Sequence, residues 1–430
     1  MKEAQELTVN IEKVGYGAHG IGKHEGKTVF VPGTIPGDQV LVRIESDKGR
    51  YAHAKLLRYL EKSPHTSTSP CPYESCGGCQ WLHASVSEQL LWKGSFVRDA
   101  FEIIGKISIP NDYKLIPSSM DLNYRNRVLL RGTVHKDGRL GVGFFKKATK
   151  EQVHIDKCMI ARPALNRVIA QLSQMHVAVK PQKFRMELQE FESFSGQSAQ
   201  VSVVIHPVLK QERSLEKLAD KIRSLPEVIW AGLSHELKKP PFLALESYEG
   251  IKYFSAPGQF FQVNLAHNRK LRSFVKNEVE KVSGAEKILD LFCGSGNLSL
   301  GLAAMGKTIL GIEANSIAIK AANYAVIYNQ LENCHYKTGD ALKYLSKISQ
   351  KQEHFDVLII DPPRAGMKEG MSLVKEVAPT KIIYVSCDPN TLARDLAELK
   401  QDYQLESLSS FDFFPHTYHV ETAAVLQRQC

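Results

Sequence analysis

The stretch KILDLFCGSGNLSLGLAAMG, residues 287–306, decides the fold of the C-terminal part of this 430-residue chain. An apolar run typical of a strand leads into a glycine-rich turn, and a helical pattern follows the turn. Gly294 and Gly296 allow the backbone to turn tightly and to approach a ligand closely. The stretch therefore predicts a strand–turn–helix unit with a binding site at the strand end.

Further apolar strand-like runs follow this unit, with helical patterns between them. They are KTILGIEA (307–314), FDVLIIDPP (355–363) and KIIYVSC (381–387). Strands that alternate with helices form a parallel sheet with crossover helices. We therefore expect an α/β domain over residues 256–430.

Acidic side chains follow successive strands of this expected sheet. Glu313 is placed to accept hydrogen bonds from two ribose hydroxyls, Asp340 could accept one from an adenine amino group, and Asp361 ends the fourth strand. A dinucleotide site also has a glycine turn with a downstream acid, but Ser299 stands where its third glycine would be. The ordered series favours S-adenosylmethionine over a nicotinamide cofactor.

A candidate nucleophile, Cys387, lies in YVSCDPNTLARDL, residues 384–396, between a predicted strand and a predicted helix. Helix N-termini lower the pKa of thiols and so raise their thiolate content. A buried structural cysteine is the alternative. The position of Cys387 at the same strand-end face as the cofactor signals favours the nucleophile.

The first 62 residues predict a small β-barrel. Strand-like segments at residues 7–14, 27–33, 38–46 and 51–60 are separated by turns rich in Gly, Pro and Asp. About five short strands at this spacing suggest a closed barrel of the OB type, a common nucleic-acid-binding scaffold.

Three of the eight cysteines lie close together in CPYESCGGC, at Cys71, Cys76 and Cys79. The chain has a polar start and no run of about 18 apolar residues, so we expect a cytoplasmic protein with no membrane span. In that compartment a cysteine cluster indicates a metal, cluster or catalytic site rather than disulfides. The spacing with a distant fourth ligand, Cys158, fits an iron–sulfur cluster, and tetrahedral zinc is the competing interpretation.

Positive charge is concentrated between residues 123 and 150, within a net charge of +9. Such a segment suits a phosphate backbone, and a solvated basic hairpin is the alternative. The basic residues are Arg125, Arg127, Arg131, Lys136, Arg139, Lys146, Lys147 and Lys150.

Five motifs together resemble one family, the RNA uracil carbon-5 methyltransferases that use S-adenosylmethionine. The resemblance covers nearly the whole chain, its N-terminal barrel resembles the TRAM domain, and its architecture is most similar to the enzymes that modify 23S ribosomal RNA. The motifs are GQFFQVN (258–264), DLFCGSGN (290–297), DPPRAG (361–366), VSCDP (385–389) and FPHTYHVE (414–421).

The resemblance implies a chemistry for these residues. Cys387 would add to carbon 6 of uracil, so that carbon 5 becomes nucleophilic and accepts the methyl group, and Glu421 would remove the proton from carbon 5. The base must leave its stack, and Phe261 is a candidate surface to receive it. The implied cofactor contacts are Gln262, Phe292, Gly294, Gly296, Asn297, Glu313, Asp340 and Asp361.

The resemblance also implies a [4Fe–4S] cluster on Cys71, Cys76, Cys79 and Cys158, although the first gap is one residue shorter than the family pattern. A cluster is not needed for methyl transfer, so its role would be structural or RNA-positioning. From the concentrated positive charge of the basic segment, we expect Lys146 and Lys147 to contact RNA phosphates and Arg125 and Arg127 to lie closer to the target base.

The expected organisation is a TRAM or OB-like barrel at 1–62, a central α+β domain with the cluster at 63–255, and a class I, Rossmann-like methyltransferase domain at 256–430. A helix at 85–105 could pack on the last of these. We expect a monomer that methylates a uridine of 23S ribosomal RNA. Transfer RNA as substrate, an inactive RNA-binding or assembly factor, and an amino methyltransferase remain alternatives.

Overall fold

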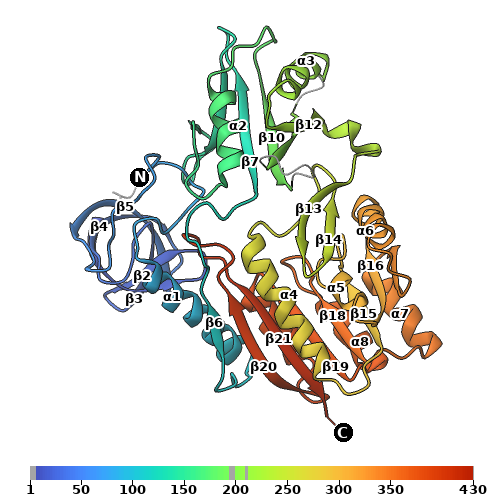
Figure 1. Ribbon diagram of the computed structural model, residues 1–430. Coiled ribbons are helices and arrows are strands. Elements are labelled where there is room, and N and C mark those ends of the chain that lie inside the picture. The colour runs from blue at the N-terminus through green and yellow to red at the C-terminus, as the bar shows by residue number, and fades with distance from the viewer. Residues whose placement is uncertain (1–5, 193–198, 209–211, 430) are drawn as a thin grey trace.

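Four sheets organise the part of the chain that the computed structural model describes, which is residues 6–192, 199–208 and 212–429. In Figure 1 the barrel lies on the left, a six-stranded sheet with two helices lies at the top, and an eight-stranded sheet lies at the lower right. Across these described ranges, no helix is both long and apolar enough to span a bilayer.

The N-terminal barrel is closed and has the strand order β1-β2-β3-β5-β4, as expected for the OB type. One strand, β2, lies in a glycine-rich stretch that the sequence suggested was a turn. A Cβ atom on Gly20 would lie 2.0 Å from Thr34 Oγ1, and one on Gly22 would lie 2.2 Å from the Asn10 carbonyl oxygen. The glycines are needed because the backbones approach closely, not because the chain turns. The strands are β1 (Glu6–Gly15), β2 (His19–His24), β3 (Lys27–Pro32), β4 (Gln39–Asp47) and β5 (Tyr51–Glu61).

The central sheet has the order β12-β11-β10-β7-β8-β9 and buries an apolar core with two helices, α2 (Pro163–Ser173) and α3 (Glu212–Arg223). The basic segment of the sequence forms its antiparallel strands β7 and β8 and the turn beyond β8. The strands are β7 (Arg127–Val134), β8 (Leu140–Phe145), β9 (Gln152–His154), β10 (Gln182–Phe191), β11 (Gln200–Pro207) and β12 (Val228–Leu233). A hairpin of β13 (Leu243–Tyr248) and β14 (Ile251–Ser255) leads on to the C-terminal sheet.

The C-terminal sheet has the order β17-β16-β15-β18-β19-β21-β20-β6. Its first five strands are parallel, and β21 is antiparallel to both of its neighbours. The strands are β15 (Lys287–Leu291), β16 (Thr308–Glu313), β17 (Cys334–Thr338), β18 (Val357–Ile360), β19 (Lys381–Ser386), β20 (Tyr403–Phe411) and β21 (Glu421–Arg428). The accompanying helices are α4 (Leu265–Glu280), α5 (Leu300–Ala303), α6 (Ser316–Tyr328), α7 (Ala341–Lys351), α8 (Met371–Val377) and α9 (Pro389–Ala397).

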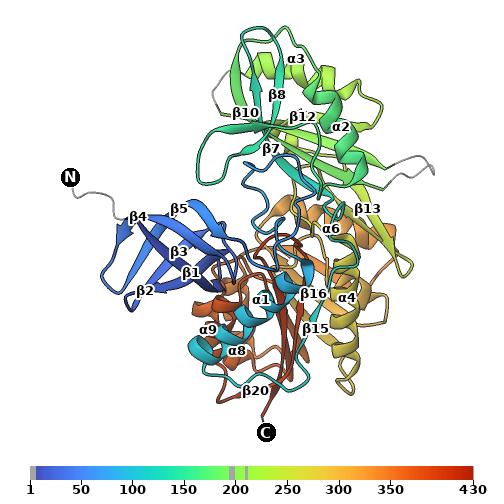
Figure 2. The same cartoon turned by 90° about the vertical axis from the view of Figure 1, so that its left-hand side faces the viewer.

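Residues 86–116 pack with this C-terminal sheet, although they precede the central sheet in sequence. The expected helix consists of α1 (Val86–Asp99) and a π-helical end (Ala100–Gly105). Val97 and Phe101 join the same core as Leu392 of α9. The short strand β6 (Lys114–Ile116) pairs with β20 at the sheet edge. Figure 2 shows α1 between the barrel and the C-terminal elements.

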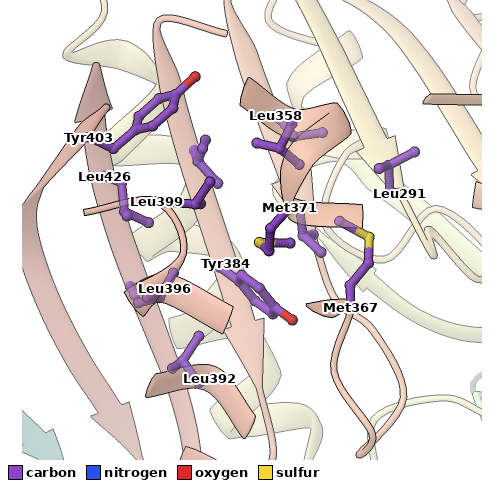
Figure 3. Close-up of a cluster of buried hydrophobic side chains, with 14 of the residues drawn as sticks. Leu291, Leu358, Met367, Met371, Tyr384, Leu392, Leu396, Leu399, Tyr403 and Leu426 are labelled. Atoms are coloured by element: carbon purple, nitrogen blue, oxygen red, sulfur yellow. The ribbon is translucent and has the colours of Figure 1, made fainter. Parts of the chain in front are cut away.

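The core on this face of the sheet surrounds Tyr384 of β19. Figure 3 shows Leu392 and Leu396 of α9 and Met371 of α8 gathered beside the Tyr384 ring. The Tyr384 hydroxyl donates to Asp395 Oδ2 at 2.7 Å, so the buried phenol keeps a hydrogen-bond partner. This packing holds α9, the helix that follows Cys387, firmly against the sheet.

A buried ion pair joins α1 to the end of β20. Lys93 Nζ lies 2.5 Å from Asp412 Oδ1, and both side chains are at most 1% exposed. Lys93 also donates to the carbonyl of Phe414 at 2.9 Å. A buried charge that has lost its partner destabilises the folded protein strongly. The pair therefore fixes the start of the loop that runs from β20 to Glu421.

We predict that Lys93→Met will lower the free energy of unfolding by about 3–5 kcal/mol, because it leaves the Asp412 carboxylate buried and unpaired. Urea denaturation followed by circular dichroism measures the change. The matched control is Lys27→Met, which removes an exposed pair with Asp47 at 2.6 Å and should cost less than about 1 kcal/mol. Equal stability of the two variants would show that the buried pair does not hold this loop.

Candidate functional site

The glycine turn after β15 has an unusual backbone conformation. Phe292, Gly294 and Gly296 all have positive φ, at 61°, 55° and 81°. Such a φ is strained for phenylalanine and free for glycine. A Cβ atom on Gly294 would meet nothing within 4 Å, whereas one on Gly296 would lie 2.6 Å from the Tyr336 hydroxyl. The turn is thus packed tightly on the Gly296 side and open at Gly294, where a ligand can reach the backbone.

Carboxylates surround this open turn. Glu313, at the end of β16, accepts hydrogen bonds from the backbone N–H of Gly294 at 3.3 Å and of Asn315 at 2.8 Å. Removal from water and the nearby Glu313 raise the pKa of Asp361, at the end of β18. The Glu313 carboxylate thus lies close enough to Asp361 to disfavour its charged form.

A third acid, Asp290, contacts the segment that follows the turn through Ser299. Its Oδ2 accepts from the Ser299 hydroxyl at 2.5 Å, and that hydroxyl also lies 2.9 Å from Tyr336 Oη. Burial, followed by the charges of Asp361 and Glu313, raises the pKa of Asp290 to about 7. Ser299, which replaces the third glycine of a dinucleotide turn, therefore serves a buried hydrogen-bond network.

Three other expected cofactor contacts have partners within the protein. Asn297 Oδ1 accepts from the guanidinium of Arg272 at 2.8 Å. Asp340 caps α7, accepting from the Lys343 N–H at 2.9 Å. Gln262 is only 6% exposed and lies in the loop before α4. Their contact with a cofactor stays a prediction.

The structure places Cys387 and Glu421 at neighbouring strand ends. Ser386 of β19 pairs with Thr422 of β21, so Cys387 and Glu421 each lie one residue beyond this pair, at the same edge of the sheet. Asp361 follows the next strand, β18, at that edge. A thiol, a buried carboxylate and the cofactor turn therefore meet in one place.

The expected lowering of the Cys387 pKa is wrong for this structure. Burial, followed by the charge of Glu421, raises the pKa of the thiol to about 12, and Arg364 opposes the shift. At the start of α9 the Asn390 N–H donates to the Asp388 side chain, which caps the helix, at 2.9 Å. Burial and the nearby carboxylate thus outweigh the helix N-terminus.

Sequence reasoning overlooked Arg364 and His419 as site residues. The Arg364 guanidinium lies near the Cys387 thiol and lowers its pKa. Arg364 Nη2 also lies 3.3 Å from His419 Nε2. Burial, with Arg364 nearby, lowers the pKa of His419 to about 4, so the imidazole is neutral and can accept from the guanidinium. The signal was present: Arg364 directly follows the two prolines after Asp361.

Glu421 has the electrostatic character expected of a base. Burial and the charge of Asp361 raise its pKa, and Arg364 opposes them. The side chain is 2% exposed. A carboxylate in such a place is a stronger base than one in water.

The prediction that the Phe261 ring receives the target base needs a correction. Phe261 is 3% exposed and packs in a core with Leu243 and Leu265, so its faces are covered. Its neighbour Phe260 is 66% exposed, and the Arg127 guanidinium lies 5.9 Å from its ring centroid. Adjacent residues in an extended loop point to opposite sides, and the exposed ring here is Phe260.

The four cysteines of the expected cluster line one cavity of about 150 Å³, together with Arg125. Chain segments nearly 80 residues apart in sequence thus bring Cys158 to Cys71, Cys76 and Cys79. Among the described residues, no group of three or more His, Cys, Asp or Glu side chains is arranged to hold a metal ion.

The cysteine loop is joined to the basic hairpin by backbone hydrogen bonds. Gly77 N–H donates to the Phe145 carbonyl at 2.9 Å, and Lys147 N–H donates to the Ser75 carbonyl at 3.0 Å. An open cleft of about 490 Å³ lies between this hairpin and the barrel, lined by Arg131, Lys146 and Lys147 as well as by His19 of the barrel. Lys146 also pairs with the exposed Glu151.

The whole chain is similar to known proteins. Residues 108–429 match the tRNA (Uracil-5-)-methyltransferase family, and residues 2–57 match the TRAM domain. A protein of Shewanella amazonensis, 23S rRNA (uracil(1939)-C(5))-methyltransferase RlmD, is 31% identical over 99% of this chain and 96% of its own. The protein of the same name from Shewanella sediminis is 32% identical over 98% and 96%.

A similar solved structure is that of Pyrococcus abyssi tRNA (uracil-54, C5)-methyltransferase in complex with S-adenosyl-L-homocysteine. It is 25% identical, has a TM-score of 0.71, and covers 98% of this chain and 100% of that one.

We predict that alkylation of Cys387 by iodoacetamide will accelerate about tenfold per pH unit between pH 7 and 9, because a thiol with a pKa of about 12 gains thiolate in that proportion. Mass spectrometry of the Cys387 peptide measures the rate. Arg364→Gln should slow it at every pH, since the guanidinium lowers the thiol pKa. Arg43→Gln, on the barrel surface, is the control. A plateau below pH 9 would contradict the raised pKa.

Proposed function

This chain belongs to the tRNA (uracil-5-)-methyltransferase family, and we propose that it methylates carbon 5 of a specific uridine in 23S ribosomal RNA. Members of the family are RNA methyltransferases that use S-adenosylmethionine, and this chain is such an enzyme. The observation that carries the proposal is the meeting of Cys387, Glu421 and the open glycine turn at one sheet edge.

The choice of ribosomal RNA rests on the relatives that match along their full length. The two Shewanella relatives match 99% and 98% of this chain and 96% of their own lengths, and they are named for 23S ribosomal RNA. The Pyrococcus structure, which also covers the whole chain, is named for transfer RNA. Transfer RNA is therefore the second candidate substrate.

The cofactor site fits S-adenosylmethionine. The backbone at Gly294 is open to a ligand, and the carboxylates of Glu313 and Asp361 can accept hydrogen bonds from nucleoside hydroxyl groups and attract a positive sulfonium. When bound, the cofactor supplies the methyl group as an electrophile. Phe292, Gly296 and Asp340 would complete its contacts, with Gln262 and Asn297 behind them.

The catalytic residues we propose are Cys387, Arg364 and Glu421. The Cys387 thiolate adds to carbon 6 of uracil, and the electron pair of the double bond moves toward carbon 5 and the carbonyl. The Arg364 guanidinium stabilises the thiolate in a site that otherwise disfavours it. After carbon 5 has been methylated, the Glu421 carboxylate takes its proton, and the carbon–sulfur bond breaks to release the thiolate.

We propose that Phe260 and the basic residues bind the RNA. An exposed aromatic ring can stack on a base turned out of its helix, and Arg127 beside it can hold a phosphate or stack as well. Arg125 lines the cysteine cavity, and Lys146 and Lys147 line the cleft between the barrel and the hairpin; the two cavities share Leu129 and Phe144. The positive charge of Arg131, Lys146 and Lys147 in this cleft suits the phosphates of an RNA strand.

The same proposal assigns a [4Fe–4S] cluster to Cys71, Cys76, Cys79 and Cys158. The four cysteines line one cavity, which supports a four-thiolate site. Zinc is the alternative metal for the same four thiolate ligands. The cluster would hold the cysteine loop on the basic hairpin. We retain from the sequence the expectation of a cytoplasmic monomer with units at 1–62, 63–255 and 256–430, except that residues 86–116 of the middle unit pack with the C-terminal sheet.

The target is tested with RNA from a strain that lacks this protein. Purified enzyme and S-adenosylmethionine should produce 5-methyluridine at one position of the 23S ribosomal RNA, because the proposed substrate is a single uridine. Mass mapping of RNA fragments locates the product. Methylation of transfer RNA alone would replace the proposed substrate. RNA binding without methylation of either RNA would favour the inactive assembly factor.

Two variants test the chemistry with the same RNA. Cys387→Ala should abolish methylation and keep cofactor binding, because the thiol acts on the base. Glu421→Gln should permit addition and methylation but slow proton removal, so that a covalent protein–RNA complex accumulates on a denaturing gel. Normal turnover by either variant would remove that residue from the mechanism.

We predict about four iron atoms per chain in protein purified without oxygen, with broad visible absorbance, because four thiolates would hold one cluster. Cys158→Ser should lose most of the iron. Cys334→Ser, which changes a buried cysteine outside the cavity, is the control. About one zinc and no iron would replace the cluster with a zinc site.

A further inference from the structure

The turn between β1 and β2 extends from the barrel toward the methyltransferase site. Gly17 and Ala18 have positive φ, at 100° and 64°, and Ala18 N–H donates to the Gly15 carbonyl at 3.1 Å. This tight turn presents the side chain of Tyr16 to the rest of the protein. Val14, Ala18 and Ile35 of the barrel pack around it in one cluster with residues of α1.

Tyr16 contacts two parts of the site at once. Its hydroxyl donates to the backbone carbonyl of Cys387 at 3.3 Å, across 371 positions of sequence. Its ring meets the ring of Tyr418 edge to face at 5.4 Å, and Tyr418 in turn lies 4.1 Å from the His419 ring. A second edge-to-face contact, at 5.7 Å, joins Tyr16 to Phe96 of α1.

The Tyr16 hydroxyl is a constant donor. Burial, followed by the charges of Asp388 and Cys387, raises its pKa well above the ordinary value. The phenol therefore stays protonated over the working pH range, and its proton is available to a carbonyl oxygen. The contact does not depend on titration of either partner.

A hydrogen bond to the Cys387 carbonyl can influence the direction of the Cys387 side chain. Cys387 lies between the last residue of β19 and the cap of α9, where the chain has left the sheet and has not begun the helix. A hydrogen bond to the carbonyl fixes the peptide plane and, through it, the direction of the Cα–Cβ bond. The Tyr418 contact acts in the same way on the segment that leads to Glu421.

We propose that Tyr16 is a positioning residue, through which the barrel holds the Cys387 backbone and the Tyr418–Glu421 segment in the reactive arrangement. The barrel thus has a role in catalysis besides binding RNA. This inference rests on the proposed function, since it concerns how the Cys387 thiol reaches a uracil base. It places the reactive thiol under the control of a separately folded part of the chain.

The test is Tyr16→Phe, which removes the donor and keeps the ring contacts. Its matched control is Tyr59→Phe, because the Tyr59 hydroxyl also donates to a backbone carbonyl, that of Gly33 at 2.7 Å, but within the barrel. The probe is 23S ribosomal RNA transcribed with 5-fluorouridine, on which the enzyme should form a stable adduct after methyl transfer. Denaturing gels give the single-turnover rate of adduct formation.

Tyr16→Phe should slow adduct formation about three- to tenfold, in line with one lost hydrogen bond, without raising the RNA concentration that gives half the maximal rate. Tyr59→Phe should form adduct at the wild-type rate. A second measurement needs no RNA: Cys387 of Tyr16→Phe should be alkylated by iodoacetamide faster than in the control, because its backbone is less restrained.

Adduct formation by Tyr16→Phe within twofold of wild type, with unchanged alkylation, overturns the positioning role and leaves the proposed function intact. An equal slowing in both variants also overturns it, because a general loss of barrel stability would then explain the effect. Failure of the wild-type enzyme to form any adduct overturns the proposed function and this inference together.

Discussion

The active site depends on the buried ion pair between Lys93 and Asp412. It links a helix that precedes the central sheet to the loop that follows β20, and Lys93 also holds the Phe414 carbonyl. Gln89, one turn earlier on α1, accepts from His416 N–H at 2.8 Å in the same loop. The loop leading to Glu421 is therefore held by α1 at Asp412, Phe414 and His416, in addition to its own hydrogen bonds between Thr417 and Phe414. The buried charges make this arrangement specific, because any other placement of the loop would leave Asp412 unpaired.

Much of the fold could be predicted from local sequence. The runs that became β15, β16, β18 and β19 are apolar because both faces of a parallel sheet are covered, and this pattern needs no knowledge of distant residues. Strand β2 could not be predicted in this way. Its glycines resemble a turn, and only the close approach of Thr34 and Asn10 explains them. The position of β6 beside β20 is likewise a tertiary property, with no signal in its three residues.

The candidate site shows the same division. The strand-end positions of Cys387 and Glu421 followed from motifs, and the structure brings them together at one sheet edge. The raised pKa of the Cys387 thiol could not be predicted from the motifs. Burial and the carboxylate of Glu421 act on the thiol through the folded structure and outweigh the nearby helix N-terminus. The sequence pointed to Phe261 as the ring for the base, whereas the exposed ring is that of Phe260, and this difference has a similar cause. Two adjacent aromatic residues look alike in sequence, and only the packed core of Leu243 and Leu265 decides which ring is covered.

The place of β6 and α1 in the C-terminal sheet has a consequence for synthesis on the ribosome. Both elements emerge early, yet β6 pairs with β20, which pairs in turn with the last strand, β21, and α1 shares its core with Leu392 of α9. The apolar side of α1, with Val97 and Phe101, must wait for Leu392 and its neighbours before it is covered. The barrel and central sheet can form while translation continues, but the catalytic unit is completed only when the final strand is released. Shortening the chain by that strand would therefore separate β20 and the early strand β6 from β19, and it would remove Ala424 and Leu426 from the core that α1 shares, which makes incomplete products prone to aggregate.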